Sequence, residues 1–139
     1  MIVDERMVTY IHSLESSENE IIETMKKSSF SENIASEILE KEGINAAVVN
    51  IHTIKPIDKE LITASAKKTG KVVTVEEHSI IGGLGSAVCE ALAETVPTPV
   101  LRIGVQDVFG ESGPAKALIA KYGLDAESIY KKVKEYLAK

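Results

Sequence analysis

The feature that most constrains this chain is a regular alternation of helical and β-prone segments from about residue 32 to the C-terminus. Apolar residues recur every three or four positions in the helical segments, and short runs rich in β-branched residues separate them. The predicted helices lie at 31–42, 58–70, 82–92, 112–123 and 125–137, and the predicted strands lie at 46–51, 71–75 and 97–103. Because strands joined through single helices form right-handed βαβ units, this order predicts an α/β fold with a parallel sheet between helices.

Glycine and aspartate residues mark the ends of the predicted helices. Glycine readily adopts the left-handed conformation that terminates a helix, and an Asp side chain accepts hydrogen bonds from the first free N–H groups. The marking residues are Gly43, Gly70 and Gly123 at helix ends, and Asp58 and Asp125 at helix starts.

The first thirty residues are harder to assign. Residues 7–14 can form a strand, and residues 18–27 can form a short amphipathic helix, because Ile21, Ile22 and Met25 share one face. We therefore divide the chain into a divergent N-terminal segment, 1–30, which can supply the first strand or strands, and a domain at 31–139.

The bulk composition predicts one globular domain with an aliphatic core. The chain has 139 residues, 44% of them hydrophobic, with 4% aromatic residues and no Trp. A net charge of −5 argues against binding a nucleic-acid backbone, and no apolar run approaches the roughly 20 residues needed to cross a bilayer. The opening residues lack the apolar region of a signal peptide, and the single Cys89 has no partner for an internal disulfide. We therefore expect a cytoplasmic protein.

The segment 76–86 is the strongest candidate site, because it joins a strand end to a glycine-rich helix start. Ligands bind at the carboxyl ends of strands in open parallel sheets, and free N–H groups at a helix start attract anions. The spacing is not that of a dinucleotide or P-loop fingerprint, so a tight turn that brings helix and sheet together is the favoured reading. The candidate residues for an anion site or a turn are Glu77, His78, Gly82, Gly83, Gly85 and Ser86.

Other reactive side chains are weaker candidates. Neighbouring side chains on a strand point to opposite faces, so Glu76, Glu77 and His78 do not predict a metal site. We expect Cys89 to be a packed side chain, because nothing nearby in the sequence lowers its pKa. The polar segment 107–114, with an exposed-looking Phe109, is either a partner contact or a turn into the next helix, and the sequence favours the turn.

Four ordered segments together resemble the C-terminal domain of transketolases. They are 50–58 (NIHTIKPID), 75–86 (VEEHSIIGGLGS), 102–105 (RIGV) and 109–113 (FGESG). The resemblance covers about residues 32–139 and is strongest to the split-gene bacterial and archaeal type. The related domains of deoxyxylulose-phosphate synthase and of 2-oxo acid dehydrogenase beta subunits carry looser versions of the pattern.

The resemblance implies a three-layer α/β/α domain with a mostly parallel sheet and one antiparallel strand. It also implies that the complete enzyme moves two-carbon ketol units between sugar phosphates, as in the pentose phosphate pathway, with thiamine diphosphate and Mg²⁺. Other domains hold those cofactors through a Gly-Asp-Gly motif, which this sequence lacks. No catalytic residue or metal ligand carries over to this chain, so we expect it to be inactive alone.

The implied role is therefore assembly. We expect partners that bind thiamine diphosphate, and self-association of the chain through surfaces that the other domains normally cover. Two alternatives stay open: the same domain from another thiamine enzyme, and a stand-alone small-molecule-binding module that uses the crevice at 82–86. Residues 1–30 depart from the family pattern, so the resemblance does not predict the first strands or the edge of the sheet.

Overall fold

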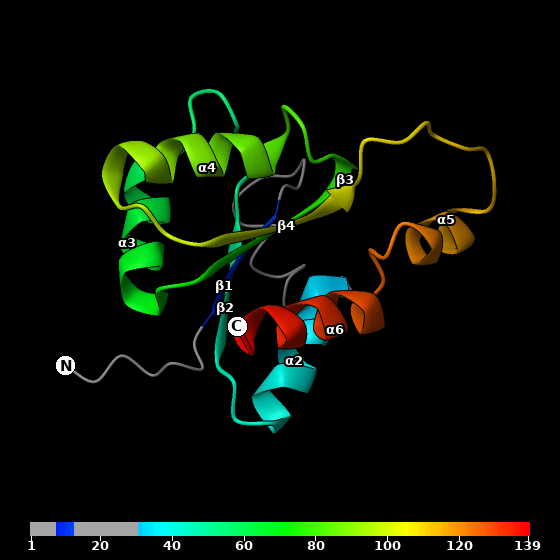
Figure 1. Cartoon of the computed structure of the whole chain (residues 1–139), viewed down its shortest axis with the longest axis horizontal. Helices are drawn as coiled ribbons and strands as arrows, with labels where there is room; N and C mark the ends of the chain where they lie inside the picture. Colours follow the sequence, from blue (N-terminus) through cyan, green and yellow to red (C-terminus); the bar gives the residue numbers. More distant parts are fainter. Residues whose placement is uncertain (1–7, 13–30) are drawn as a thin grey trace.

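The computed structural model describes residues 8–12 and 31–139 and has the predicted α/β order. The strands are β1 (Val8–His12), β2 (Ala46–Asn50), β3 (Val72–Ser79) and β4 (Val100–Val105). The helices are α2 (Ser31–Lys41), α3 (Lys59–Thr69), α4 (Leu84–Thr95), α5 (Ala115–Lys121) and α6 (Ala126–Leu137). Figure 1 shows the sheet between two helical layers, with α3 and α4 on one face and α2 and α6 on the other.

The sheet order is β2-β1-β3-β4, and all three pairings of these described strands are parallel. From β1 the chain first moves outward to β2, then crosses back over β1 to β3 and continues to β4. Right-handed crossovers that run in opposite directions place their helices on opposite faces, which puts α2 on one face and α3 and α4 on the other. The antiparallel strand that the family resemblance implies is not among the four described strands.

β1 lies at the centre of this sheet, inside the segment 7–14 where the sequence allowed a strand. β2 is therefore an edge of the described sheet, and its residues are half-buried. The short helix expected at 18–27 lies outside the described residues.

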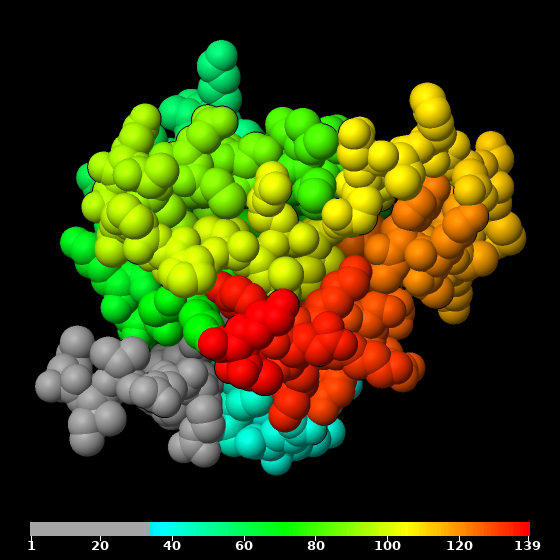
Figure 2. Space-filling model, in the orientation of Figure 1, coloured from blue at the N-terminus to red at the C-terminus, as the bar shows by residue number. Residues whose placement is uncertain are grey.

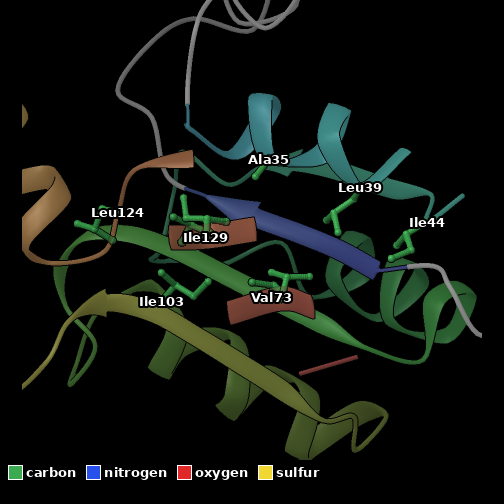
Figure 3. Packing of buried hydrophobic residues seen from close by; sticks show 9 residues of the cluster. Ala35, Leu39, Ile44, Val73, Ile103, Leu124 and Ile129 are labelled. Carbon is green, nitrogen blue, oxygen red and sulfur yellow. The ribbon is translucent and has the colours of Figure 1, made fainter. Parts of the chain in front are cut away.

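Two aliphatic clusters fill the spaces between the layers. The cluster beneath α2 and α6 contains Ala35, Leu39, Ile44, Val73, Val75, Ile103, Leu124, Ile129 and Val133, and Figure 3 shows it from close by. The cluster beneath α3 and α4 contains Ile51, Ile62, Ala66, Val72, Leu84, Val88 and Leu92. The alternation of side chains along β3 divides Val72 from Val73 and Val75, so one strand contributes to both clusters.

The predicted helix caps are present. The Asp58 side chain accepts a hydrogen bond from the N–H of Leu61 at 2.9 Å, and Asp125 accepts one from Ser128 at 3.3 Å. Gly70 and Gly123 have φ angles of 70° and 68°, as expected where a helix ends in the left-handed region.

The strand boundaries differ from the sequence prediction. β3 continues to Ser79, although the prediction ended it at Val75 before two glutamates and a histidine. Pairing of Ser79 with Val105 extends the strand, so the tertiary partner overrides the low β-propensity of charged residues. β4 begins at Val100, three residues later than predicted. Prolines 97 and 99 have no N–H to donate to a ladder.

A polar contact supports the packing of α6 on α2. Lys134 and Tyr130 of α6 both hydrogen-bond the carboxylate of Glu42, which follows α2. The hydrogen bond from Lys134 lowers the pKa of Glu42 most, and the hydrogen bond from Tyr130 lowers it further. All three groups are near solvent, so the apolar cluster contributes more to this interface than the ion pair does. No helix in the described ranges is both long enough and apolar enough to cross a membrane.

Leu39→Ala should test the cluster beneath α2 and α6. Leu39 is fully buried, so the truncation should lower the free energy of unfolding by about 2–5 kcal/mol. Leu61→Ala on α3 is the matched control, because Leu61 is 41% exposed. Urea unfolding followed by circular dichroism measures both. Equal small losses for the two variants would contradict this account of the core.

Candidate functional site

The candidate site begins with an irregular pairing at the end of β3. Val75 pairs with Ile103 and Ser79 pairs with Val105, so residues 76–78 of β3 face the single residue Gly104 of β4. A Cβ atom at Gly104 would lie 2.9 Å from the carbonyl oxygen of His78 and 3.0 Å from Cγ of Glu76. The absence of a side chain at this position therefore lets the β3 irregularity lie against β4. Such bulges redirect side chains at functional sites.

Glu76 is the buried polar residue of this segment, with 7% of its surface exposed. The alternation along β3 puts Glu76 on the same face as Val72, which is the face that α4 covers. Its carboxylate accepts hydrogen bonds from the backbone N–H groups of Leu84, at 2.8 Å, and of Gly85, at 2.9 Å. These are the first two residues of α4, so Glu76 satisfies N–H groups that have no partner within the helix.

This capping contact bears on whether the start of α4 can bind an anion from outside the chain. A helix N-terminus carries partial positive charge and attracts anions. In this chain the anion is a carboxylate from the chain itself, held 8 and 9 residues earlier in sequence. The sequence prediction placed Glu76 in the candidate segment but not among its six candidate residues, although an acidic residue at a strand end just before Gly-Gly-x-Gly could have suggested it.

The glycines of the turn are required for two different reasons. A Cβ atom at Gly83 would lie 2.1 Å from Oε2 of Glu76 and 2.8 Å from the carbonyl oxygen of Ser79. A Cβ atom at Gly85 would lie 2.9 Å from Cδ of Arg102. Gly82 alone of the three has a positive φ, 76°. The φ angle of Gly83 is −95°, so its backbone conformation does not require glycine, and the crowding alone does.

Ser86 and Arg102 close the turn around the carbonyl oxygen of Ile80. The Ser86 hydroxyl donates to this oxygen at 3.0 Å and accepts from the N–H of Gly82 at 2.9 Å. Nη1 of Arg102, on β4, donates to the same oxygen at 3.0 Å. The hydroxyl of Ser86 is thus used within the turn.

Glu77 and His78 lie on the open side of the turn and are exposed. Nδ1 of His78 lies 3.1 Å from the carbonyl oxygen of its neighbour Ser79. A hollow of about 550 Å³ opens here, lined by Ile54, Glu76, Glu77, His78, Gly82, Gly83 and Leu84. The structure therefore brings together all the predicted site residues in one turn, but only Glu77, His78, Gly82 and Gly83 line this hollow.

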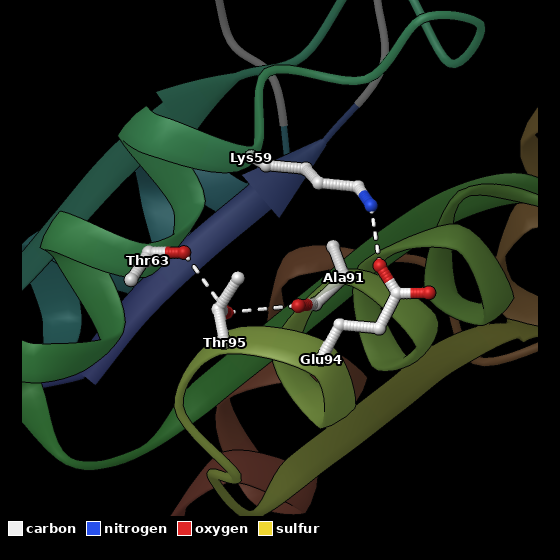
Figure 4. A network of polar contacts seen from close by, with 5 residues as sticks. All are labelled: Lys59, Thr63, Ala91, Glu94 and Thr95. Atoms are coloured by element: carbon white, nitrogen blue, oxygen red, sulfur yellow. Dashed lines mark hydrogen bonds and ion pairs between the residues drawn. The ribbon is translucent and has the colours of Figure 1, made fainter.

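A second hollow of about 330 Å³ shares Ile54, Gly82 and Gly83 with the first and continues between α3 and α4. Figure 4 shows the polar contacts along this interface. Lys59 pairs with Glu94, the Thr63 hydroxyl donates to the Thr95 hydroxyl at 3.0 Å, and Thr95 donates to the carbonyl oxygen of Ala91 at 2.8 Å. The Lys59–Glu94 pair is exposed and neutralises charge at the rim, so this hollow has no strong preference for either sign of ligand.

The weaker candidates stay outside the site. Cys89 is half-buried on α4, and burial raises the pKa of its thiol, which fits a packed side chain. Within the described ranges no three His, Cys, Asp or Glu side chains gather to hold a metal ion. Phe109 is 99% exposed on the loop between β4 and α5.

The three-layer α/β/α fold and the crevice at the strand ends define a class of domain, and comparison with known proteins identifies its family. Residues 29–129 match the family model of the transketolase C-terminal domain. The chain therefore belongs to the transketolase C-terminal domain family. A solved split-gene transketolase, described as an inactive beta4 tetramer, has a similar structure, with a TM-score of 0.76 and 45% sequence identity. The match covers 96% of this chain and 40% of the chain in that structure.

Curated relatives agree with this assignment. The 6-deoxy-6-sulfo-D-fructose transketolase subunit of Clostridium sp. strain MSTE9 is 50% identical over 102 residues, which are 73% of this chain and 32% of the relative. A transketolase C-terminal section from Methanocaldococcus jannaschii is 53% identical over 106 residues, 76% of this chain and 33% of the relative. The 1-deoxy-D-xylulose-5-phosphate synthase of Syntrophotalea carbinolica is 50% identical over 105 residues, 75% of this chain and 17% of the relative. The chain spans a third or less of these relatives.

Substitutions at Gly83 and Glu76 should test whether the turn is structural. Gly83→Val places atoms where the Glu76 carboxylate lies, so we expect a loss of about 1–3 kcal/mol in the free energy of unfolding. Glu76→Ala leaves two N–H groups without their acceptor and should cost about 1–3 kcal/mol. The two changes disrupt one contact. The double variant should therefore lose less free energy of unfolding than the sum of the two single losses.

Gly110→Val is the matched control for Gly83→Val, because a Cβ atom at Gly110 meets nothing within 4 Å. Urea melts of all variants give the comparison. Unchanged midpoints for both Gly83→Val and Gly85→Val would mean that the glycines serve a ligand instead.

Proposed function

We propose that this chain is the non-catalytic C-terminal part of a transketolase-type enzyme and serves its assembly. The observation that carries the proposal is the family match over residues 29–129, together with relatives that are described as subunits or sections of transketolases. The chain spans only about a third of those relatives, so the remaining two-thirds must come from elsewhere in the enzyme. We propose residues 31–139 as the domain, with β1 added to its sheet by the N-terminal segment.

The complete enzyme, in this proposal, transfers two-carbon ketol units between sugar phosphates. Thiamine diphosphate, with Mg²⁺, supplies the carbanion chemistry when it is bound. The start of α4 does not fit a diphosphate, because the Glu76 carboxylate already accepts from its N–H groups and would repel an anion. We therefore place both cofactors in the other parts of the enzyme, derive no catalytic step for this chain, and propose a cytoplasmic location for the assembly.

The equivalent domain of a 1-deoxy-D-xylulose-5-phosphate synthase is the second candidate. The relative from Syntrophotalea carbinolica supports it, because its identity over the matched residues equals that of the Clostridium transketolase subunit. The two candidates predict the same role for this chain and differ in the substrates of the complete enzyme.

The chain alone should not turn over substrate, and a partner should restore activity. We expect no release of product from a ketose phosphate, or from pyruvate with glyceraldehyde 3-phosphate, when the pure chain is supplied with thiamine diphosphate and Mg²⁺. A tagged chain purified from its own cells should bring down a thiamine-diphosphate-binding polypeptide, and the complex should use one of the two substrate sets. Activity that scales with the pure chain, or recovery without such a polypeptide, would contradict the proposal.

Self-association of the isolated chain is a further expectation. Several large apolar side chains are exposed on the described surface, among them Ile34, Ile54 and Ile81, and such surface commonly marks a lost interface. Sedimentation velocity over a hundredfold range of concentration should show a species larger than the monomer. A monomer at every concentration would argue against this part of the proposal.

A further inference from the structure

The loop between β4 and α5 presents two apolar side chains to solvent. Phe109 is 99% exposed and Val108 is 58% exposed. Figure 2 shows that this part of the chain, yellow to orange, stands out from the body at one end of the molecule. An aromatic side chain of this size usually buries 150–250 Å² in a core or an interface. Within the described structure Phe109 uses almost none of its surface for either.

Polar contacts lie at both ends of the loop. At its start, Nε2 of Gln106 donates to the carbonyl oxygen of Gly104 at 3.2 Å. At its end, Glu111 forms an ion pair with Lys121 of α5 at 2.5 Å. Ile119 of α5 packs against the cluster beneath α2 and α6, which ties the helix to the body. Both partners of the Glu111–Lys121 pair are exposed, so this ion pair restrains the loop only weakly.

The charges around Phe109 indicate the chemistry of its partner. Residues 106–113 contain two acidic residues, Asp107 and Glu111, and no basic residue. Lys121 neutralises Glu111, so Asp107 is the acidic group next to the apolar pair. A pocket that is apolar inside and basic at its rim complements this arrangement. A second copy of the chain is less suitable, because its net charge is −5.

We propose that Phe109, supported by Val108, anchors this chain in an apolar pocket with a basic rim on the cofactor-binding part of the enzyme. This inference rests on the proposed function. In that proposal, the two-thirds of the relatives' length that this chain does not span belongs to the other parts of the enzyme. Buried aromatic anchors at the centre of an interface contribute a large share of its binding energy, while polar residues around them set orientation and association rate.

Phe109→Ser in the full chain tests the anchor. The probe is the thiamine-diphosphate-binding polypeptide that co-purifies with the wild-type chain, titrated by calorimetry. We expect Phe109→Ser to weaken binding about tenfold or more, and Phe109→Leu to weaken it less because an apolar side chain remains. Leu61→Ser on α3 is the matched control and should stay within about twofold, because α3 lies away from the loop. Asp107→Asn should slow association and reduce its dependence on salt.

The outcomes separate the anchor from the proposed function. Unchanged binding by Phe109→Ser, with an unchanged urea midpoint, overturns the anchor and leaves the proposed function intact. Equal losses for Phe109→Ser and Leu61→Ser also overturn it. If sedimentation shows that Phe109→Ser abolishes self-association while the partner still binds normally, a second copy is the occupant and this proposal is wrong. A wild-type chain that binds no such polypeptide overturns the proposed function and the anchor together.

Discussion

The contact on which this structure depends most is the hydrogen-bonded carboxylate of Glu76 at the start of α4. It joins the end of β3 to a helix that covers one face of the sheet. Burying a carboxylate is unfavourable unless its hydrogen bonds are replaced, and here two helix N–H groups replace them. Gly83 and Gly104 leave space for Glu76, because a Cβ atom at Gly83 would meet its carboxylate and one at Gly104 would meet its Cγ. The glycine-rich turn is thus built around an internal side chain.

This arrangement distinguishes the turn from the anion-binding turns that it resembles. The crevice lies at the carboxyl ends of the strands, where α/β proteins commonly bind ligands. Its helix terminus, however, is occupied by Glu76, and its outer hollow is rimmed by the balanced pair Lys59 and Glu94. The features that stand out on the described surface are instead apolar and protruding, above all Phe109. The shared architecture therefore does not by itself assign a function to the crevice, since activity depends on the site and not on the fold.

Much of the fold could be read directly from the residues. Helical spacing, β-branched runs and helix caps depend on neighbours close in sequence, so Asp58, Gly70 and Asp125 mark their helices correctly. The charged end of β3 could not be read in this way, because only its pairing with β4 makes it a strand. The role of Gly83 was also beyond the sequence pattern. Its φ is ordinary, and the reason for glycine is an oxygen atom seven residues earlier in the chain.

The sequence by itself determined the α/β class, the order of elements and the family, because ordered local patterns carry that information. Tertiary structure decided which residues of the turn serve the fold and which face solvent. Glu76 and Glu77 are adjacent and chemically alike, yet one is buried under α4 and the other lies open to the crevice. Strand alternation sends the two side chains to opposite faces, and the position of α4 over one face makes that difference structural.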